Sequence, residues 1–135
     1  MAERRPDRTL GPPHDDFWGF CARGEFRLQR CQRCLHFAWP PRLECERCGS
    51  RDLTWETLSG RGTVVSWCTL EQRYYQELTT PWDVVLVELE EGPLFVANPL
   101  GFLASDVQPH MLVRVAFIDC EDDAGTYRLP VFERA

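Results

Sequence analysis

Two pairs of cysteines, Cys31-x-x-Cys34 and Cys45-x-x-Cys48, have the spacing of a tetrahedral metal site. In each pair, backbone amides point at the sulfurs and offset the thiolate charge. Four thiolates form a closed shell with no open position for water or substrate, so the predicted site is structural and not catalytic. Zinc is the predicted metal, and iron in the same four-thiolate shell is the chemical alternative.

The residue after each cysteine pair predicts the local backbone. This position often needs a positive φ, which glycine adopts without steric cost. Gly49 meets the requirement and Leu35 does not, so the first knuckle is expected to be strained or differently shaped. His36 lies inside the loop, but four cysteines already complete the shell, and we expect this histidine to be partly exposed instead of binding metal.

The remaining side chains suggest no catalytic chemistry. The three histidines lack a Ser or Cys partner at motif spacing, and no phosphate-binding loop or dinucleotide fingerprint occurs. The acidic pairs Glu90-Glu91 and Asp122-Asp123 are expected in solvated turns. Three further cysteines are predicted to be small buried apolar residues: Cys21, Cys68 and Cys120.

Local patterns predict the elements that position the cysteines. Residues 1–14 carry charge and proline and are expected to form a flexible leader. Residues 15–30 should form a helix, capped by Asp15 or Asp16, and then a strand in which Phe26 and Leu28 alternate with polar residues. Residues 31–55 are the predicted ribbon, in which consecutive prolines exclude a helix.

Residues 56–135 are predicted to close into a small barrel or a sandwich, and an OB-fold barrel is the natural candidate at this size. Short β-branched and aromatic segments alternate with turns, beginning at the segment LTWETLS of residues 53–59. In the clearest hairpin, Val85, Val87 and Leu89 face one way, and the turn falls at residues 91–93. The fold class expected from these patterns is mostly β, with an N-terminal helix, a zinc ribbon and a C-terminal OB-type barrel.

Charge argues against nucleic acid as the ligand. Residues 1–55 hold ten arginines against eight acidic residues, whereas residues 56–135 hold five against thirteen, for net charges of +2 and −8. A metallated four-thiolate site adds about −2. Phosphate binding needs a positive surface, so a single-strand binder that stacks bases on Tyr74, Tyr75 and Trp82 is disfavoured. With no long apolar stretch and no secretion signal, we expect a cytoplasmic protein without membrane contact.

Several motifs together resemble the domain-of-unknown-function 35 family of zinc-ribbon/OB-fold proteins. They are Phe17-Trp18, the two cysteine pairs, Pro40-Pro41-Arg42, Gly60-Arg61-Gly62 and the Val-x-Leu-x-x-Gly hairpin, and they extend from about Phe17 to the C-terminus. The resemblance implies an N-terminal helix, a rubredoxin-like zinc ribbon and a C-terminal OB-fold barrel. It implies a non-catalytic partner of thiolase-superfamily enzymes that process acyl-CoA: thiolases, acyltransferases or steroid side-chain aldolases. It also implies a hetero-oligomer built on an enzyme dimer, with a hydratase-like subunit in some members.

Three functions are therefore compared: an accessory subunit of such an enzyme, a free-standing acyl-CoA binding module, and a single-strand nucleic-acid binder. Arginines and aromatic residues are the side chains that interfaces favour, and they suit both a partner and CoA. For Trp18 and Trp39, packing of the helix onto the ribbon is an equal alternative. The candidate partner- or CoA-binding residues are Trp18, Phe37, Trp39, Pro40, Pro41, Arg42 and Arg61.

Overall fold

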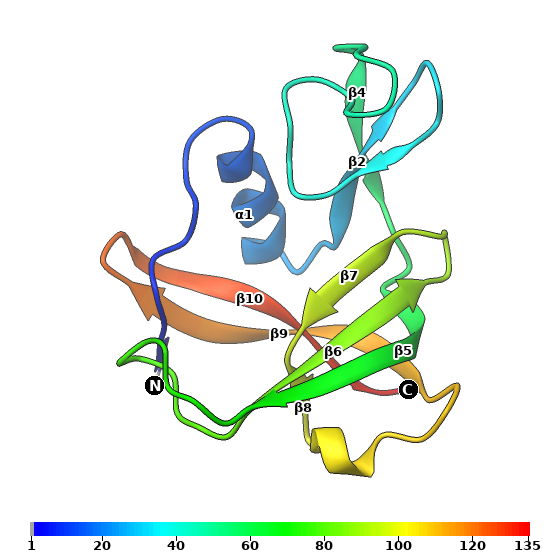
Figure 1. Cartoon of the computed structure of the whole chain (residues 1–135). Helices are drawn as coiled ribbons and strands as arrows, with labels where there is room; N and C mark the ends of the chain where they lie inside the picture. The colour runs from blue at the N-terminus through cyan, green and yellow to red at the C-terminus, as the bar shows by residue number, and fades with distance from the viewer. Residues whose placement is uncertain (1) are drawn as a thin grey trace. The chain divides into compact units, whose positions relative to one another are not determined.

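The computed structural model describes residues 2–135 and divides into two compact units. Thr9–Leu58 form one, which we call the ribbon unit. The residues up to Arg8 together with Ser59–Ala135 form the other, which we call the large unit. In sequence, the ribbon unit is thus an insertion between residues 8 and 59 of the large unit. Figure 1 shows the course of the chain through both units. In residues 2–135, no helix has the length and apolar character needed to cross a membrane.

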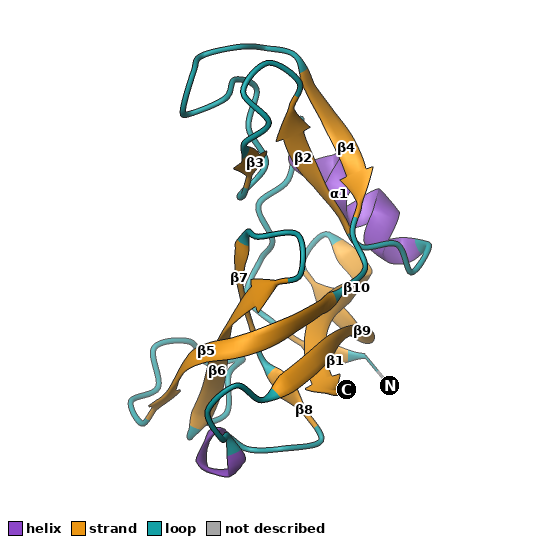
Figure 2. Ribbon diagram, turned by 90° about the vertical axis from the view of Figure 1, so that its right-hand side faces the viewer, coloured by secondary structure: helices purple, strands orange, loops and turns teal. Residues whose placement is uncertain are grey.

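A three-stranded antiparallel sheet forms the centre of the ribbon unit (Figure 2). Strand β2 (Arg27–Cys31) pairs with β3 (Phe37–Ala38) on one side and with β4 (Leu53–Thr57) on the other. The boundary predicted between the ribbon (31–55) and the barrel (56–135) falls within β4, which pairs with β2 over its whole length. The local pattern identifies a strand, but the choice of partner depends on contacts distant in sequence.

Helix α1 (His14–Ala22) packs within the ribbon unit through aromatic contacts. Phe17 is 2% exposed, and its ring centroid lies 4.6 Å from that of Trp39. The N-cap is Pro13, so Asp15 and Asp16 lie in the first turn instead of capping the helix. Acidic side chains there still interact favourably with the exposed amides of the helix N-terminus.

The large unit is built on one long, mostly antiparallel sheet. Its strands follow the order β7-β6-β5-β9-β10-β8, and the short strand β1 (Glu3–Arg4) pairs in parallel with β9. The remaining bounds are β5 Arg61–Leu70, β6 Trp82–Leu89, β7 Leu94–Ala97, β8 Pro99–Leu100, β9 Leu112–Asp122 and β10 Gly125–Arg134, with a 3-10 turn at Ala104–Asp106.

The mostly β fold class is confirmed, but the expected closed barrel is not. No hydrogen-bonded pairing joins β7 to β8, the two ends of the strand order, within residues 2–135. Strand β8 has only two residues, Pro99 and Leu100, and its proline lacks the amide hydrogen that a ladder needs. The sheet therefore remains open at this seam.

Alternating apolar residues build the core of the large unit, as the sequence predicts. In the β6–β7 hairpin, Val85 and Val87 are fully buried and Leu89 is 2% exposed. The Leu89 amide donates to the Pro93 carbonyl across the predicted turn. Cys21 and Cys120 are buried as expected, whereas Cys68 is exposed near the far end of β5, so the prediction for that cysteine was wrong.

The segment before α1, expected to be a flexible leader, is partly held on the large sheet. Glu3 and Arg4 lie along β9, and the Arg5 amide donates to the Glu121 carbonyl. Arg5 is 9% exposed, donates to Asn98 and stacks over the ring of Trp82. These contacts join the segment to residues more than 75 positions later, which is why no local pattern in residues 1–14 predicts them.

Asp122 is buried in an ion pair and not in a solvated turn, so that prediction was wrong. The Arg8 side chain and backbone amide both donate to the Asp122 carboxylate, whose side chain is fully buried. The hydrogen bond from the Arg8 guanidinium lowers the pKa of Asp122 from 3.8 to about 2. Burial of both charges costs free energy, which their mutual attraction and hydrogen bonds offset. The pair holds the N-terminal segment against the end of β9.

Replacing Asp122 with Asn should lower the free energy of unfolding at pH 7 by roughly 2 kcal/mol. Because the folded-state pKa is depressed, the contribution of the pair is present above pH 3.8 and is lost as the pH falls toward about 2. Urea unfolding of variant and wild type from pH 7 downward should show the difference shrinking in that range. Asp123→Asn, whose side chain is 73% exposed, is the control; an equal effect there would contradict the assignment.

Gly62→Ala should destabilise the protein by roughly 1–3 kcal/mol. A Cβ at this position on β5 would lie 2.6 Å from the Glu88 carbonyl oxygen and 2.5 Å from a methyl carbon of Val87, and the backbone oxygen has little freedom to move. Thermal unfolding measures the loss. Gly19→Ala on α1 meets nothing within 4 Å and is the matched control, expected to be neutral or slightly stabilising.

Candidate metal centre

The structure brings the four cysteines of the two pairs together. Their Sγ atoms all lie within 4.8 Å of one another. The Cys31 and Cys48 sulfurs are 3.5 Å apart, and those of Cys34 and Cys45 are 3.6 Å apart. Four sulfurs at this separation match the ligand set of a tetrahedral metal ion.

Two backbone turns of the same form hold the sulfurs. The Leu35 amide donates to the Cys31 carbonyl and the Gly49 amide to the Cys45 carbonyl, both at 2.8 Å. Leu35 has φ 66° and Gly49 has φ 77°, so both knuckles take the left-handed conformation. The first knuckle was expected to be strained or differently shaped. It keeps the same turn as the second knuckle, and Leu35 adopts the left-handed conformation that glycine usually takes.

Polar contacts fix the loop between the knuckles. The Gln29 side chain donates to the Arg42 carbonyl and accepts from the Arg42 amide, at 2.9 and 2.7 Å. Gln29 is only 4% exposed, although the alternation in β2 predicted that it would face solvent. Its partner lies 13 residues later, so the sequence pattern carries no signal for this role. The Glu46 carboxylate contacts both His36 and Arg42.

The four thiols cannot ionise independently at this distance. The Cys34 amide hydrogen bond lowers the pKa of Cys31 to about 6. The His36 amide also favours the Cys34 thiolate, but burial and the neighbouring sulfurs outweigh it and raise the pKa of Cys34 to about 11. A divalent cation removes this competition by binding all four groups as thiolates. The donor set therefore fits zinc and, in the same geometry, iron.

The candidate partner- or CoA-binding residues are divided between the two units: Arg61 belongs to the large unit and the other six to the ribbon unit. Trp18 and Trp39 both contact the Phe17 ring, at 5.1 and 4.6 Å between centroids, which is the packing alternative for these two residues. The Trp18 indole donates to the Thr9 carbonyl. Within the ribbon unit, Phe37 stacks against the Arg30 guanidinium.

The neighbouring loop residues differ in exposure. Pro40 and Arg42 are exposed, whereas Pro41 is buried. Arg61 belongs to the large unit, where it lines a cavity of about 530 Å³ beside Arg114, its cross-strand neighbour. Two glutamates, Glu88 and Glu90, line the same cavity and offset its positive charge.

Known proteins share both units. Residues 18–54 match the family model described as the ChsH2 rubredoxin-like zinc ribbon domain, and residues 55–117 match the ChsH2 C-terminal OB-fold domain. A chain of the solved structure named Ltp2-ChsH2(DUF35) aldolase is 26% identical, with a TM-score of 0.79 over 95% of this chain and 98% of that one. A DUF35 protein of unknown function from Sulfolobus solfataricus, 15% identical, shares the fold at a TM-score of 0.58 over 78% of both chains.

Two curated relatives extend the comparison. A probable enoyl-CoA hydratase alpha subunit from Thermomonospora curvata is 33% identical over 142 residues, which cover 100% of this chain and 43% of the relative. A DUF35 domain-containing scaffold protein from Pyrococcus furiosus is 34% identical over 79 residues, which cover 55% of this chain and 52% of the relative. The chain matches about half the length of each relative.

The fold and the four-cysteine site define a protein that joins a zinc ribbon to an OB fold. The chain belongs to the DUF35 family.

Cys31→Ser should reduce bound zinc from about one ion per chain to near zero, because three thiolates cannot complete the closed shell. Elemental analysis of the purified protein measures the loss, and thermal unfolding should show that the ribbon unit melts early. Cys68→Ser is the matched control, since this exposed cysteine lies outside the cluster. Retention of a full equivalent of zinc in Cys31→Ser would contradict the ligand assignment.

Proposed function

We propose that this chain is a non-catalytic, zinc-containing accessory subunit of a thiolase-superfamily enzyme that processes acyl-CoA. The observation that carries the proposal is the likeness, over 95% of this chain, to a chain of a structure whose name joins a DUF35 protein to an aldolase. The curated name of scaffold protein for a second relative agrees with a role without chemistry of its own. The partner enzyme would be a thiolase, an acyltransferase or a steroid side-chain aldolase.

The candidate metal centre supports a structural role within that assembly. A ribbon unit of 50 residues buries little apolar surface, so zinc would supply much of its folding energy. All four ligand positions are protein sulfurs, which leaves no site for a substrate on the metal. Cys31, Cys34, Cys45 and Cys48 would therefore shape a surface for the partner and take no part in its reaction.

The assembly would be a hetero-oligomer built on an enzyme dimer, with one copy of this chain on each enzyme subunit. A hydratase-like subunit is a further candidate member, because the relative from Thermomonospora curvata bears that name. The residues proposed to contact the partner or the CoA moiety are Phe37, Trp39, Pro40 and Arg42 of the ribbon unit and Arg61 of the large unit. Trp18 and Pro41 would support them by packing.

Charge continues to disfavour the nucleic-acid alternative. The large unit holds eight arginines against fourteen acidic residues, a net charge of −6. Tyr74 and Tyr75 are 69% and 55% exposed, so rings for stacking are present. Without a positive surface around them, these rings would gain little affinity from the phosphate backbone at physiological salt.

A tagged copy expressed in its native host should co-purify with a thiolase-superfamily chain in near-equal amount, as judged by mass spectrometry. Cys31→Ser should lose metal and partner together, because the ribbon surface would no longer be shaped. Recovery of the wild-type chain with metal but without such an enzyme would contradict the proposal. Titration with acyl-CoAs and with oligonucleotides would then distinguish the free-standing CoA module from the nucleic-acid binder.

A further inference from the structure

The backbone at Leu35 carries a conformational cost that the ribbon unit does not recover by packing. Its φ of 66° lies in the left-handed region, where glycine is favoured and where Gly49 stands at the equivalent position of the second knuckle. The Leu35 side chain is nevertheless 57% exposed. A leucine that is strained and still turned largely toward solvent suggests that its contact lies on another molecule.

A second exposed leucine accompanies it. Leu43 is 69% exposed and lies two residues before Cys45, while Leu35 directly follows Cys34. Because the cysteine sulfurs lie within 4.8 Å of one another, both leucines belong to the metal-bearing end of the ribbon unit. Their side chains therefore give this end an apolar character that the solvent does not favour.

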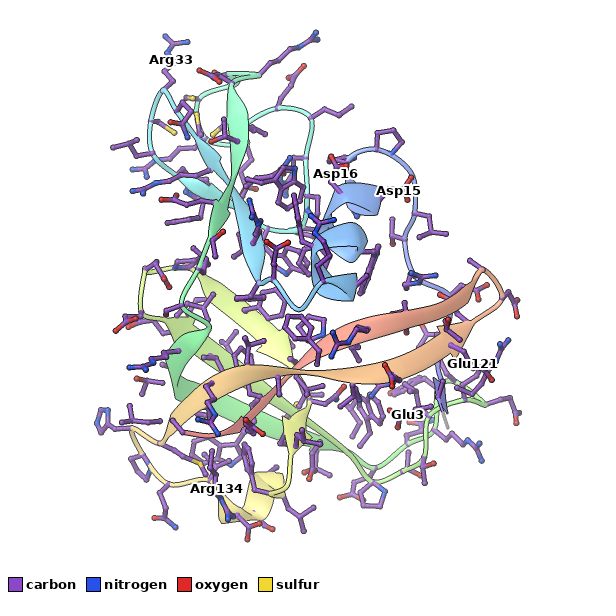
Figure 3. All side chains as sticks on the ribbon, turned by 180° about the vertical axis from the view of Figure 1, so that it is seen from behind. Glu3, Asp15, Asp16, Arg33, Glu121 and Arg134 are labelled. Carbon is purple, nitrogen blue, oxygen red and sulfur yellow. The ribbon has the colours of Figure 1, made fainter. Side chains whose placement is uncertain are left out.

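Two arginines at the same end have no ion-pair partner in the part of the chain that the structure describes. Five of the seven arginines of the ribbon unit pair with glutamates: Arg23, Arg27, Arg30, Arg42 and Arg51. Arg33 and Arg47 have no ion-pair or side-chain hydrogen-bond partner within residues 2–135. They occupy equivalent positions, each directly before the second cysteine of its pair. Figure 3 shows the Arg33 side chain projecting from the metal-bearing end of the ribbon unit, away from the sulfurs.

We propose that Arg33, Leu35, Leu43 and Arg47 form a docking surface, here called the ribbon tip, for an apolar pocket rimmed by carboxylates on the thiolase-superfamily partner. The inference rests on the proposed function and names the surface that engages the enzyme. Charge complementarity selects the occupant, since unpaired guanidinium groups are suited to bidentate contact with carboxylates. The metal shell holds the backbone rigid, which reduces the entropy lost when the leucines are buried.

A protein fits this surface better than a nucleic acid does. The net charge of a metallated four-thiolate site is about −2, so the two arginines beside it leave no excess of positive charge to bind phosphates. The two exposed leucines would gain nothing from a phosphate backbone, but they match the apolar centre of a protein interface. The arginines at its margin would then determine orientation and the rate of association.

Leu35→Gly separates docking from folding. The substitution removes the apolar side chain and also relieves the left-handed strain, so zinc content and Tm should be unchanged or higher. The Kd for the enzyme that co-purifies with the wild-type chain, expressed separately and measured by calorimetry, should rise roughly tenfold or more. Arg33→Gln combined with Arg47→Gln should also weaken binding and reduce its salt dependence. The matched controls are Leu94→Ser, an exposed leucine of the large unit, and Arg51→Gln, a paired arginine of the ribbon unit.

Each outcome bears on one of the two hypotheses. If the wild-type chain binds no thiolase-superfamily enzyme, the proposed function is wrong and the docking surface falls with it. If the wild-type chain binds and Leu35→Gly binds equally well, the subunit role stands and the ribbon tip is overturned. Loss of affinity accompanied by loss of zinc or a lower Tm would also overturn it, because the leucine would then serve the fold. Self-association or oligonucleotide binding that requires Leu35, with enzyme affinity unchanged, would assign the tip to a different occupant.

Discussion

Convergence of four cysteine sulfurs at one end of a small sheet is the constraint on which the ribbon unit depends. Four thiolates within 4.8 Å repel one another, as the opposite pKa shifts of Cys31 and Cys34 indicate, and a divalent cation turns that repulsion into attraction. The remaining features of the unit follow from holding the knuckles in place. Strand β2 leads into the first knuckle, Gln29 holds the loop before the second, and α1 covers the sheet through Phe17.

The large unit is stabilised by different means. Its sheet buries alternating apolar residues without a metal, and its N-terminal segment is secured by charge: the Arg8–Asp122 pair and the buried Arg5. The ribbon unit lies in sequence between Arg8 and Ser59, so two chain connections join it to the large unit. Metal loss should consequently affect the two units unequally, because the large sheet gains nothing directly from the thiolate shell.

In this family member, the exposed side chains around the metal site have more bearing on function than the four cysteines themselves. A closed four-sulfur shell has no chemistry to offer a substrate, yet it fixes the positions of the residues beside it. Leu35 and Arg33 both lie beside that shell. Leu35 has an unfavourable backbone conformation, and Arg33 has no carboxylate partner among residues 2–135. Such features lower the stability of an isolated chain and become favourable only when a partner covers them.

The sequence by itself determined the four candidate metal ligands, the helix, the β6–β7 hairpin and the family, because each depends on short spacings: C-x-x-C for the knuckles and period-two alternation at Val85, Val87 and Leu89. The tertiary structure alone decided what depends on distant partners. It paired β4 with β2, buried Gln29 against Arg42, placed Asp122 on Arg8 and left the large sheet open between β7 and β8. These contacts join residues that no local pattern relates, since strand pairing and buried polar contacts are selected by the geometry of the whole fold.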